Sequence, residues 1–285
     1  MSLRRARMPG NDARQEALSL ARTATIEHVA ATGSTNDDLL ARIRAAAAAG
    51  ASDFAPTLLV AERQTSGRGR HGRSWHASAG RSLTFSLAWP PPRADLAGLS
   101  LAAGIAIADA LEPPADGPSQ RIGLKWPNDL WLLDGDGDLA QRRGRKLAGI
   151  LVETAPLGAR RVAVIGVGIN IAAQQLDDAR SGVACLHEID SAATPASTLD
   201  RVAPALLAAL ARFDAGGFAA FAARFAARDL LRGRAVAAAD GRASGIAAGV
   251  AEDGALLVDT STGVIAVTSG EWRLGLVESA GAPSC

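Results

Sequence analysis

The chain of 285 residues is long enough for one large domain and a smaller one, and its 48% hydrophobic content can supply a substantial core. A formal net charge of +1 argues against a dedicated nucleic-acid-binding protein, and two distant cysteines argue against a disulfide framework or a zinc site. The N-terminus lacks the apolar region of a signal peptide, and no uncharged apolar run reaches the roughly 18 residues of a membrane span. We therefore expect a cytoplasmic protein with no membrane partner.

The first half of the chain alternates between helix and strand patterns. Ser34 followed by Asp37 resembles a helix-capping pair, and it opens a predicted helix over 35–48 that Gly50 ends. The elements expected next are strands at 57–62 and 82–89, a helix at 96–111, and strands at 122–126, 130–133, 146–154 and 161–171. This order predicts a mixed β-sheet with flanking helices.

The second half changes from helical to strand patterns. Residues 134–145 are polar and glycine-rich between two strand patterns, so a mobile hairpin loop is expected there. Apolar spacing is helical over 199–227, with a break at Gly216 and Gly217, whereas short strands follow Asp229. We predict an α+β protein with three parts: an N-terminal extension at 1–24, a large domain at 25–229 and a small all-β domain at 230–285.

A basic, glycine-rich stretch, GRGRHGRSW, occupies 67–75. It nearly matches the phosphate-binding pattern GxxxxGK[ST], but Arg73 stands in the lysine position and a strand pattern follows where that loop needs a helix. Arg68 and Arg70 are two residues apart, so in an extended loop both would project to one side and could grip an anion. A solvated basic hairpin and a nucleic-acid contact remain alternatives.

A second glycine pattern, GVGINI, fails the dinucleotide-binding motif because Ile171 stands in the third glycine position. The stretch reads instead as a buried strand in which Gly166 and Gly168 admit a planar or bulky neighbour. Asn170, at the end of this strand, either holds a sugar hydroxyl or caps a turn.

The chain contains only two lysines, Lys125 and Lys146, so each calls for an explanation. Lys125 opens KWPNDLW, where Asn128 and the following aspartate form a turn signature that either is only a turn or faces a cleft with its lysine, tryptophans and carboxylate. Lys146 begins a strand after a glycine-rich loop and is either a site residue or an edge-strand lysine that aids solubility.

Five stretches together resemble a known family, the biotin–protein ligases (biotin–[acetyl-CoA-carboxylase] ligases). They are STN at 34–36, AERQTSGRGRHGRSW at 61–75, KWPNDL at 125–130, KLAGILVE at 146–153 and GVGINI at 166–171. The resemblance runs from about Thr25 to the end, where the strand-rich segment is similar to the family's small SH3-like β-barrel. It implies a class II synthetase-like catalytic domain that binds biotin and ATP.

The resemblance also implies a reaction in two steps. Biotin and ATP form biotinyl-5'-AMP, and a lysine of the biotin carboxyl carrier protein of acetyl-CoA carboxylase then takes the biotinyl group. Mg²⁺ is implied, with no ligands assigned, and a homodimer is compatible with the family. A lipoate–protein ligase-like acyl-adenylate transferase and a non-catalytic nucleotide-binding protein are the alternatives. Since only about 24 residues precede the resemblance, too few for a winged helix-turn-helix, we expect a monofunctional ligase that binds no nucleic acid.

Site residues follow from the resemblance position by position. It implies a biotin site formed by Ser34, Thr35, Asn36, Gln64, Arg68, Gly69, Arg70 and Lys146, with Arg68, Arg70 and Lys146 in catalytic roles. It implies a nucleotide site formed by Arg70, Arg73, Trp75, Asn128, Lys146 and Asn170. These residue types suit the chemistry, because short polar side chains match a neutral ureido ring, whereas cations offset the repulsion between a carboxylate and a phosphate. His71 departs from the arginine that is frequent in the family, and we assign it no role.

Overall fold

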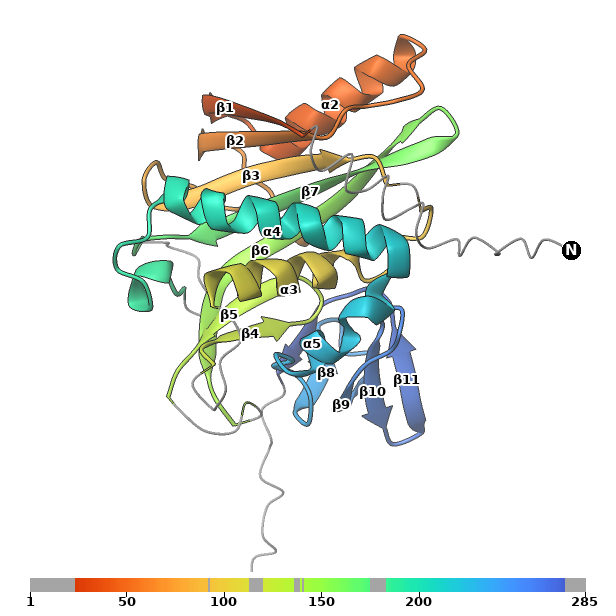
Figure 1. The fold of residues 1–285 in the computed structure, drawn as a ribbon. Coiled ribbons are helices and arrows are strands. Elements are labelled where there is room, and N and C mark those ends of the chain that lie inside the picture. The colour runs from red at the N-terminus through yellow and green to blue at the C-terminus, as the bar shows by residue number, and fades with distance from the viewer. Residues whose placement is uncertain are drawn as a thin grey trace, which may run out of the picture.

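The computed structural model describes residues 24–91, 93–112, 120–135, 139, 141–174 and 183–274. Its larger part is built on a seven-stranded sheet in the order β1-β2-β3-β7-β6-β5-β4 (Figure 1). The strands are β1 (Thr25–Thr32), β2 (Thr57–Gln64), β3 (Ser82–Trp89), β4 (Ile122–Lys125), β5 (Asp129–Leu133), β6 (Gly144–Leu157) and β7 (Arg160–Asn170). β1 and β2 run parallel, whereas the other neighbouring pairs are antiparallel, so the predicted mixed sheet is confirmed.

Helices cover both faces of this sheet. They are α2 (Thr35–Ala48), α3 (Leu99–Leu111), α4 (Pro195–Gly216) and the short α5 (Ala222–Ala226). On β2, Leu58 and Val60 belong to the larger core beneath α3 and α4, whereas Leu59 packs beneath α2 on the other face. Figure 1 shows α3 and α4 side by side across the sheet and α2 near its β1 edge. Because both faces are buried, the central strands read as nearly continuous apolar runs.

Two helices begin at residues other than those predicted. The helix expected over 96–111 starts at Leu99, because Gly98 has φ 75 and its left-handed backbone cannot continue a helix. The helical pattern expected from 199 starts earlier, since Thr194 and Ser197 form a capping box and Pro195 occupies the first turn. The predicted helix over 35–48 is confirmed, with Ser34 accepting a hydrogen bond from the backbone N of Asp37.

Strand β1 was not expected from the sequence, because an edge strand that is exposed or half-buried along its whole length carries a weak apolar pattern. Strand β6 begins at Gly144 and therefore includes the end of the segment expected as a loop. Part of that loop, the extension before residue 24 and the chain beyond 274 lie outside the described residues.

The C-terminal part is a five-stranded antiparallel sheet in the order β11-β10-β9-β8-β12. Its strands are β8 (Ala235–Ala238), β9 (Ser244–Val250), β10 (Leu256–Thr260), β11 (Gly263–Val267) and β12 (Trp272–Leu274). The expected small all-β domain is therefore present. Closure of this sheet into an SH3-like barrel and the domain boundary at residue 230 stay predictions.

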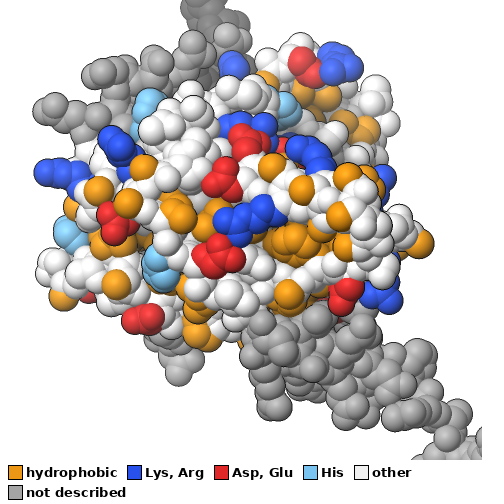
Figure 2. All heavy atoms as spheres, turned by 90° about the horizontal axis from the view of Figure 1, so that it is seen from above, with side chains coloured by type: hydrophobic (Ala, Val, Ile, Leu, Met, Phe, Trp, Pro, Cys, Tyr) orange, Lys and Arg blue, Asp and Glu red, His pale blue; other side chains and the backbone are white. Residues whose placement is uncertain are grey.

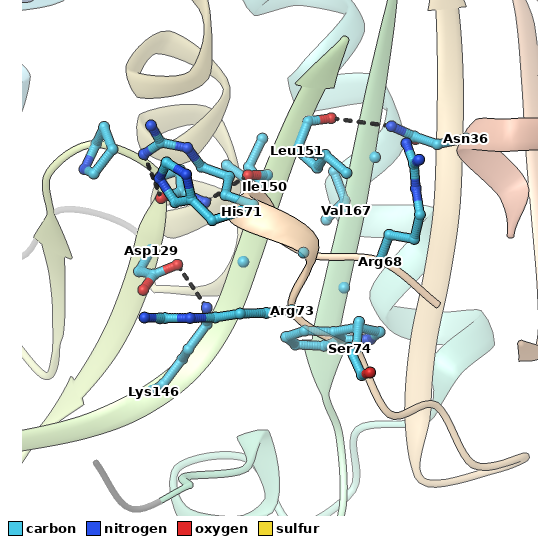
Figure 3. A pocket seen from close by; sticks show the side chains of 18 of the residues that line it. Asn36, Arg68, His71, Arg73, Ser74, Asp129, Lys146, Ile150, Leu151 and Val167 are labelled. Carbon is cyan, nitrogen blue, oxygen red and sulfur yellow. Dashed lines mark hydrogen bonds and ion pairs between the residues drawn. The ribbon is translucent and has the colours of Figure 1, made fainter. Parts of the chain in front are cut away.

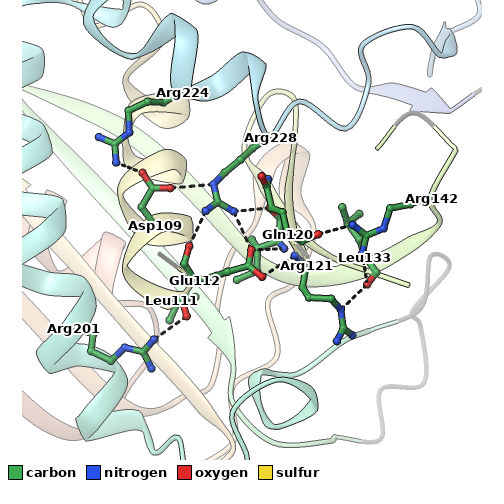
Figure 4. Close-up of polar contacts among 11 residues, drawn as sticks. Asp109, Leu111, Glu112, Gln120, Arg121, Leu133, Arg142, Arg201, Arg224 and Arg228 are labelled. Carbon is green, nitrogen blue, oxygen red and sulfur yellow. Dashed lines mark hydrogen bonds and ion pairs between the residues drawn. The ribbon is translucent and has the colours of Figure 1, made fainter. Parts of the chain in front are cut away.

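A polar cluster in the larger part holds the segment that leads to the small sheet (Figure 4). The guanidinium of Arg228, only 3% exposed, forms ion pairs with Asp109 and Glu112 at the end of α3 and donates a hydrogen bond to the backbone O of Ile122 in β4. The backbone of the same segment also pairs with β4, because Leu124 N donates to Arg228 O. A buried arginine with this many partners is satisfied, so the cluster anchors the chain as it enters the small sheet.

Charges are mixed on the face seen from above (Figure 2). Acidic and basic side chains lie next to one another there, and among the described residues on that face no broad basic area gathers. This distribution agrees with the formal net charge of +1.

Candidate functional site

One pocket gathers residues from both parts of the fold. Its walls come from the first turn of α2, the loop after β2, β3, the turn between β4 and β5, and the strands β6 and β7. Glu271 and Trp272 of the small sheet complete the lining. Figure 3 shows the loop that carries Arg68, His71 and Arg73 crossing in front of β6 and β7.

One end of the pocket is neutral and polar. Gln64 Oε1 accepts a hydrogen bond from Thr35 N at 2.8 Å, and Thr35 Oγ1 lies 2.6 Å from Ser86 Oγ. Ser86 Oγ in turn donates to Asn36 Oδ1 at 2.6 Å. Ser34, Thr35 and Asn36 are each 3% exposed, so the start of α2 is held rigidly against the sheet. Such a site suits an uncharged group with its own donors and acceptors.

The loop after β2 is fastened at Arg68. The Nη2 atom of Arg68 lies 2.5 Å from Glu153 Oε1 and 3.3 Å from Asp37 Oδ1. Burial opposes ionisation of Glu153, but hydrogen bonds from Arg68 and Asn36 outweigh it and lower the pKa of this carboxyl.

The loop is not extended at Arg70. Residues Arg70–Gly72 form a 3₁₀ turn in which His71 has φ 55, whereas Gly69, between the two arginines, is extended, so the loop turns only after Arg70. The Nη1 atom of Arg70 donates to Asn128 Oδ1 at 3.4 Å, and Asn128 Nδ2 donates to Ile150 O at 2.7 Å. Both arginines still line the pocket. Burial lowers the pKa of Arg70, although its guanidinium remains charged at neutral pH.

The glycines of β7 make room for two side chains, as predicted. A Cβ on Gly168 would lie 2.6 Å from Trp75 Nε1 and nearer still to two ring carbons, so the indole lies directly on the backbone. A Cβ on Gly166 would lie 3.0 Å from Asn36 Cγ and nearer still to Asn36 Oδ1. Only glycine permits both approaches.

The other end of the pocket is rich in charge. The Nζ of Lys146 lies 2.7 Å from Asp129 Oδ1, and its side chain is 32% exposed. Lys125 stacks over Trp131 at 5.1 Å from the ring centroid, and burial lowers the pKa of this lysine. Arg73 forms an ion pair with Glu271 of the small sheet.

The structure brings together all but one of the predicted site residues. The lining includes Ser34, Thr35, Asn36, Gln64, Arg68, Gly69, Arg70, Arg73, Trp75, Asn128 and Lys146. Asn170 is absent from this lining. It is 3% exposed and donates through Nδ2 to the backbone O of Ala184 and of Lys146, at 3.1 and 3.4 Å, so it braces the strand that carries Lys146.

Sequence reasoning missed three residues at or beside the pocket. Ser86 could have been found, because it is a polar residue in a strand that is buried throughout. Glu153 ends an apolar run and carried a weaker signal. Glu271 carried none, since only tertiary structure brings the small sheet to the loop at Arg73.

Two family profiles match the chain and together cover more than half of it. The "Biotin/lipoate A/B protein ligase family" matches residues 51–170, and the "Biotin protein ligase C terminal domain" matches residues 233–271. The chain therefore carries a biotin/lipoate A/B protein ligase domain at 51–170, followed by a biotin protein ligase C-terminal domain at 233–271. Its small antiparallel sheet therefore coincides with a domain of biotin protein ligases.

Related proteins match the sequence of this chain over part of their length. A biotin–[acetyl-CoA-carboxylase] ligase of Mycobacterium tuberculosis is 44% identical over 149 residues, which cover 51% of this chain and 49% of that protein. One from Paracoccus denitrificans is 37% identical over 169 residues, covering 56% of this chain and 65% of that protein. The match thus spans about half of the first relative's length.

Solved structures of biotin protein ligases resemble this chain over most of its length. The biotin protein ligase of Aquifex aeolicus, in complex with biotin and ATP, superposes with a TM-score of 0.70 at 26% identity, covering 88% of this chain and 99% of that chain. In the described part of the present chain, no helix is long and apolar enough to cross a membrane.

Proposed function

We propose that the protein is an ATP-dependent biotin–protein ligase that forms biotinyl-5'-AMP and transfers the biotinyl group to a lysine of a biotin carboxyl carrier protein. The observation that carries this proposal is the polarity of the pocket: a neutral hydrogen-bonding end is continuous with a cationic end, and strand glycines form the wall between them. The A. aeolicus ligase with biotin and ATP bound supports it.

The neutral end fits the ureido ring of biotin. Thr35, Gln64 and Ser34 offer short hydroxyl and amide groups, and the rest of the ring and tail would pack on aliphatic side chains and on the glycines of β7. Groups that already bind one another at 2.6–2.8 Å are preorganised, so little ordering cost remains for the ligand.

The cationic end fits two anions that must meet. In the first step a carboxylate oxygen of biotin attacks the α-phosphorus of ATP, and the bond to pyrophosphate breaks. Lys146, Arg70 and Lys125 line this end and would reduce the repulsion between the carboxylate and the phosphate. The indole of Trp75 on Gly168 would form a wall of the nucleotide site.

In the second step the neutral amine of the acceptor lysine attacks the acyl carbon, AMP leaves, and the amine loses a proton. No covalent intermediate on the protein is needed. The names of the relatives from M. tuberculosis and P. denitrificans support a carboxyl carrier protein of acetyl-CoA carboxylase as acceptor. A cytoplasmic location, a homodimer and the lack of nucleic-acid binding stay predictions.

Mg²⁺ would enter with ATP as part of the substrate. Among the described residues no group of three or more His, Cys, Asp and Glu side chains is arranged to hold a metal. Two carboxylates, Asp129 and Glu271, do line the cationic end, and Mg²⁺ favours one or two carboxylates together with phosphate oxygens. The site therefore fits an ion held mainly by the nucleotide, with chemistry limited to neutralising phosphate charge.

The test is incubation with ATP, Mg²⁺ and a biotin carboxyl carrier domain, followed by mass spectrometry. With biotin, we expect the carrier to gain the mass of one biotinyl group and pyrophosphate to be released; with lipoate and a lipoyl domain, we expect neither. Modification of the lipoyl domain alone would favour the lipoate–protein ligase alternative. Nucleotide binding without any mass gain would favour a non-catalytic protein.

A further inference from the structure

Glu153 lies beside the pocket, where one carboxylate contacts two parts of the site. It ends an apolar run on β6, and its Oε2 atom accepts hydrogen bonds from Arg68 Nη2 at 2.6 Å and from Asn36 Nδ2 at 2.9 Å. Arg68 belongs to the loop over the pocket, whereas Asn36 belongs to the first turn of α2. In Figure 3, the side chains of Asn36 and Arg68 lie together at one end of the site.

Two acceptors orient Asn36: the Glu153 carboxylate, at 2.9 Å from Asn36 Nδ2, and the backbone O of Leu151, at 3.4 Å. An ionised carboxylate can only accept hydrogen bonds, so Asn36 must turn its NH₂ group toward Glu153 and its oxygen toward Ser86. Gly166 lies so close behind the Asn36 amide that even an added Cβ would not fit between them. The amide thus has little room for another position.

The arrangement of hydrogen-bond donors and acceptors continues from Asn36 along the neutral end of the pocket. Because Ser86 donates its one hydroxyl hydrogen to Asn36, it accepts the hydroxyl hydrogen of Thr35 in their 2.6 Å contact, and Gln64 Oε1, at 3.1 Å from Thr35 Oγ1, is the alternative acceptor of that hydrogen. Gln64 Oε1 is already held by Thr35 N, which leaves Gln64 Nε2 as a donor. The pocket therefore presents an acceptor at Thr35 Oγ1 and a donor at Gln64 Nε2.

Glu153 also restrains the loop. Arg68 is paired with Glu153 and, at 3.3 Å, with Asp37 of α2, so its guanidinium is largely neutralised before any ligand arrives. The adjoining Gly69 and Arg70 form part of the pocket lining. Loss of the carboxylate would leave Arg68 with Asp37 as its remaining ion-pair partner and would leave the Asn36 NH₂ group held only by the backbone O of Leu151, at 3.4 Å.

We propose that Glu153 is a positioning residue for the neutral end of the pocket, where it sets the donor and acceptor order through Asn36 and holds Arg68 and its loop in place. This inference rests on the proposed function, because it takes the ligand of the neutral end to be the ureido ring of biotin. Glu153 is not among the residues that line the pocket, so it acts through Asn36 and Arg68.

The experiment compares Glu153→Gln, Glu153→Asp and a control in the full chain. Glutamine has the same shape as glutamate, but it carries no charge for Arg68 and can present either its oxygen or its NH₂ group to Asn36. The control is Glu27→Gln, since Glu27 forms a similarly exposed ion pair with Arg42 at 2.8 Å on strand β1 and helix α2, away from the pocket lining. Biotin and ATP binding are titrated separately by calorimetry, and kcat and KM are measured for each substrate.

For Glu153→Gln we expect biotin to bind at least about 10-fold more weakly, with ATP affinity and the melting temperature nearly unchanged. Glu153→Asp should recover part of the loss, because it retains the charge, and Glu27→Gln should behave as the unaltered protein. Wild-type biotin affinity in Glu153→Gln would overturn the inference. So would an equal loss for biotin and ATP with a lower melting temperature, since that pattern marks a merely structural residue. Failure of the unaltered protein to bind biotin would instead refute the proposed function.

Discussion

Substitution of Gly168 by alanine should displace the loop that carries Trp75 from the pocket without unfolding the protein. The new methyl group would lie 2.6 Å from Trp75 Nε1 and nearer still to two ring carbons, whereas carbon atoms prefer separations of about 3.5–4.0 Å. The indole must therefore retreat by roughly 1 Å or more. Trp75 sits on an exposed loop, so the loop can move away while β7 stays in place.

The magnitude follows from the cost of overpacking. Forcing an extra methyl into a packed contact costs about 1–3 kcal/mol, and the loop avoids that cost only by leaving its closed position. The indole also lies over Lys146, with Nζ at 5.8 Å from the ring centroid, so its retreat disturbs the cationic end of the pocket. We expect kcat/KM for ATP to fall about 10- to 100-fold in Gly168→Ala.

The assay is pyrophosphate release at varied ATP, together with thermal unfolding. Gly104→Ala on α3 is the matched control, because its Cβ would meet Leu124, Ile150 and Leu130 at ordinary distances of 3.4–3.9 Å and alanine favours a helix by about 1 kcal/mol. That variant should keep full activity and an equal or higher melting temperature. Unchanged kcat/KM for ATP in Gly168→Ala would refute the argument, as would a loss fully explained by unfolding.

Three further substitutions test other parts of the site and fold. Lys146→Ala should slow adenylate formation by about 100-fold or more in single-turnover pyrophosphate release, because the carboxylate and phosphate then lose a cation that lines their pocket; a normal rate would remove Lys146 from the mechanism. Gln64→Ala should raise the Kd for biotin at least about 10-fold by calorimetry and leave that for ATP unchanged, since its amide lies in the neutral end; equal shifts would contradict this role. Burial raises the pKa of Asp229 to about 6 in the folded protein, from an ordinary value of 3.8. The folded state therefore binds the proton more tightly than the unfolded chain does. This proton contributes to the free energy of unfolding below pH 3.8, and the contribution is lost as the pH rises through about 6. The stability of Asp229→Asn relative to the unaltered protein should therefore increase as the pH rises from 4 to 8, by roughly 1–3 kcal/mol in urea unfolding. A difference in stability that does not change with pH would contradict this prediction.

The sequence predicted the sheet and most of the site for a local reason. The residues that line the pocket lie mostly within short continuous stretches, so Ser34, Gln64, Arg70 and Lys146 could each be found from their neighbours in the chain. Their shared pocket was expected only because several such stretches resembled one family in the same order. The glycines of β7 were informative in the same way, since a missing side chain in a buried strand indicates a close neighbour even when that neighbour is unknown.

Other features depended on contacts between distant parts of the chain. The sequence did not predict the 3₁₀ turn at Arg70–Gly72, in which His71, a residue other than glycine, has φ 55. Asn170 was placed in the nucleotide site from its position, but it braces the backbone near Lys146. No local pattern marks such a difference.

The amino-acid sequence by itself determined the helices, the central strands, the family and the chemical types of the pocket residues, because apolar periodicity and short motifs act over a few neighbouring positions. Tertiary structure alone decided which charges are already paired: Arg68 with Glu153, Lys146 with Asp129, and Arg73 with Glu271 across the two parts of the fold. Those pairings depend on distances between side chains far apart in the chain, and such distances exist only after the sheet has formed.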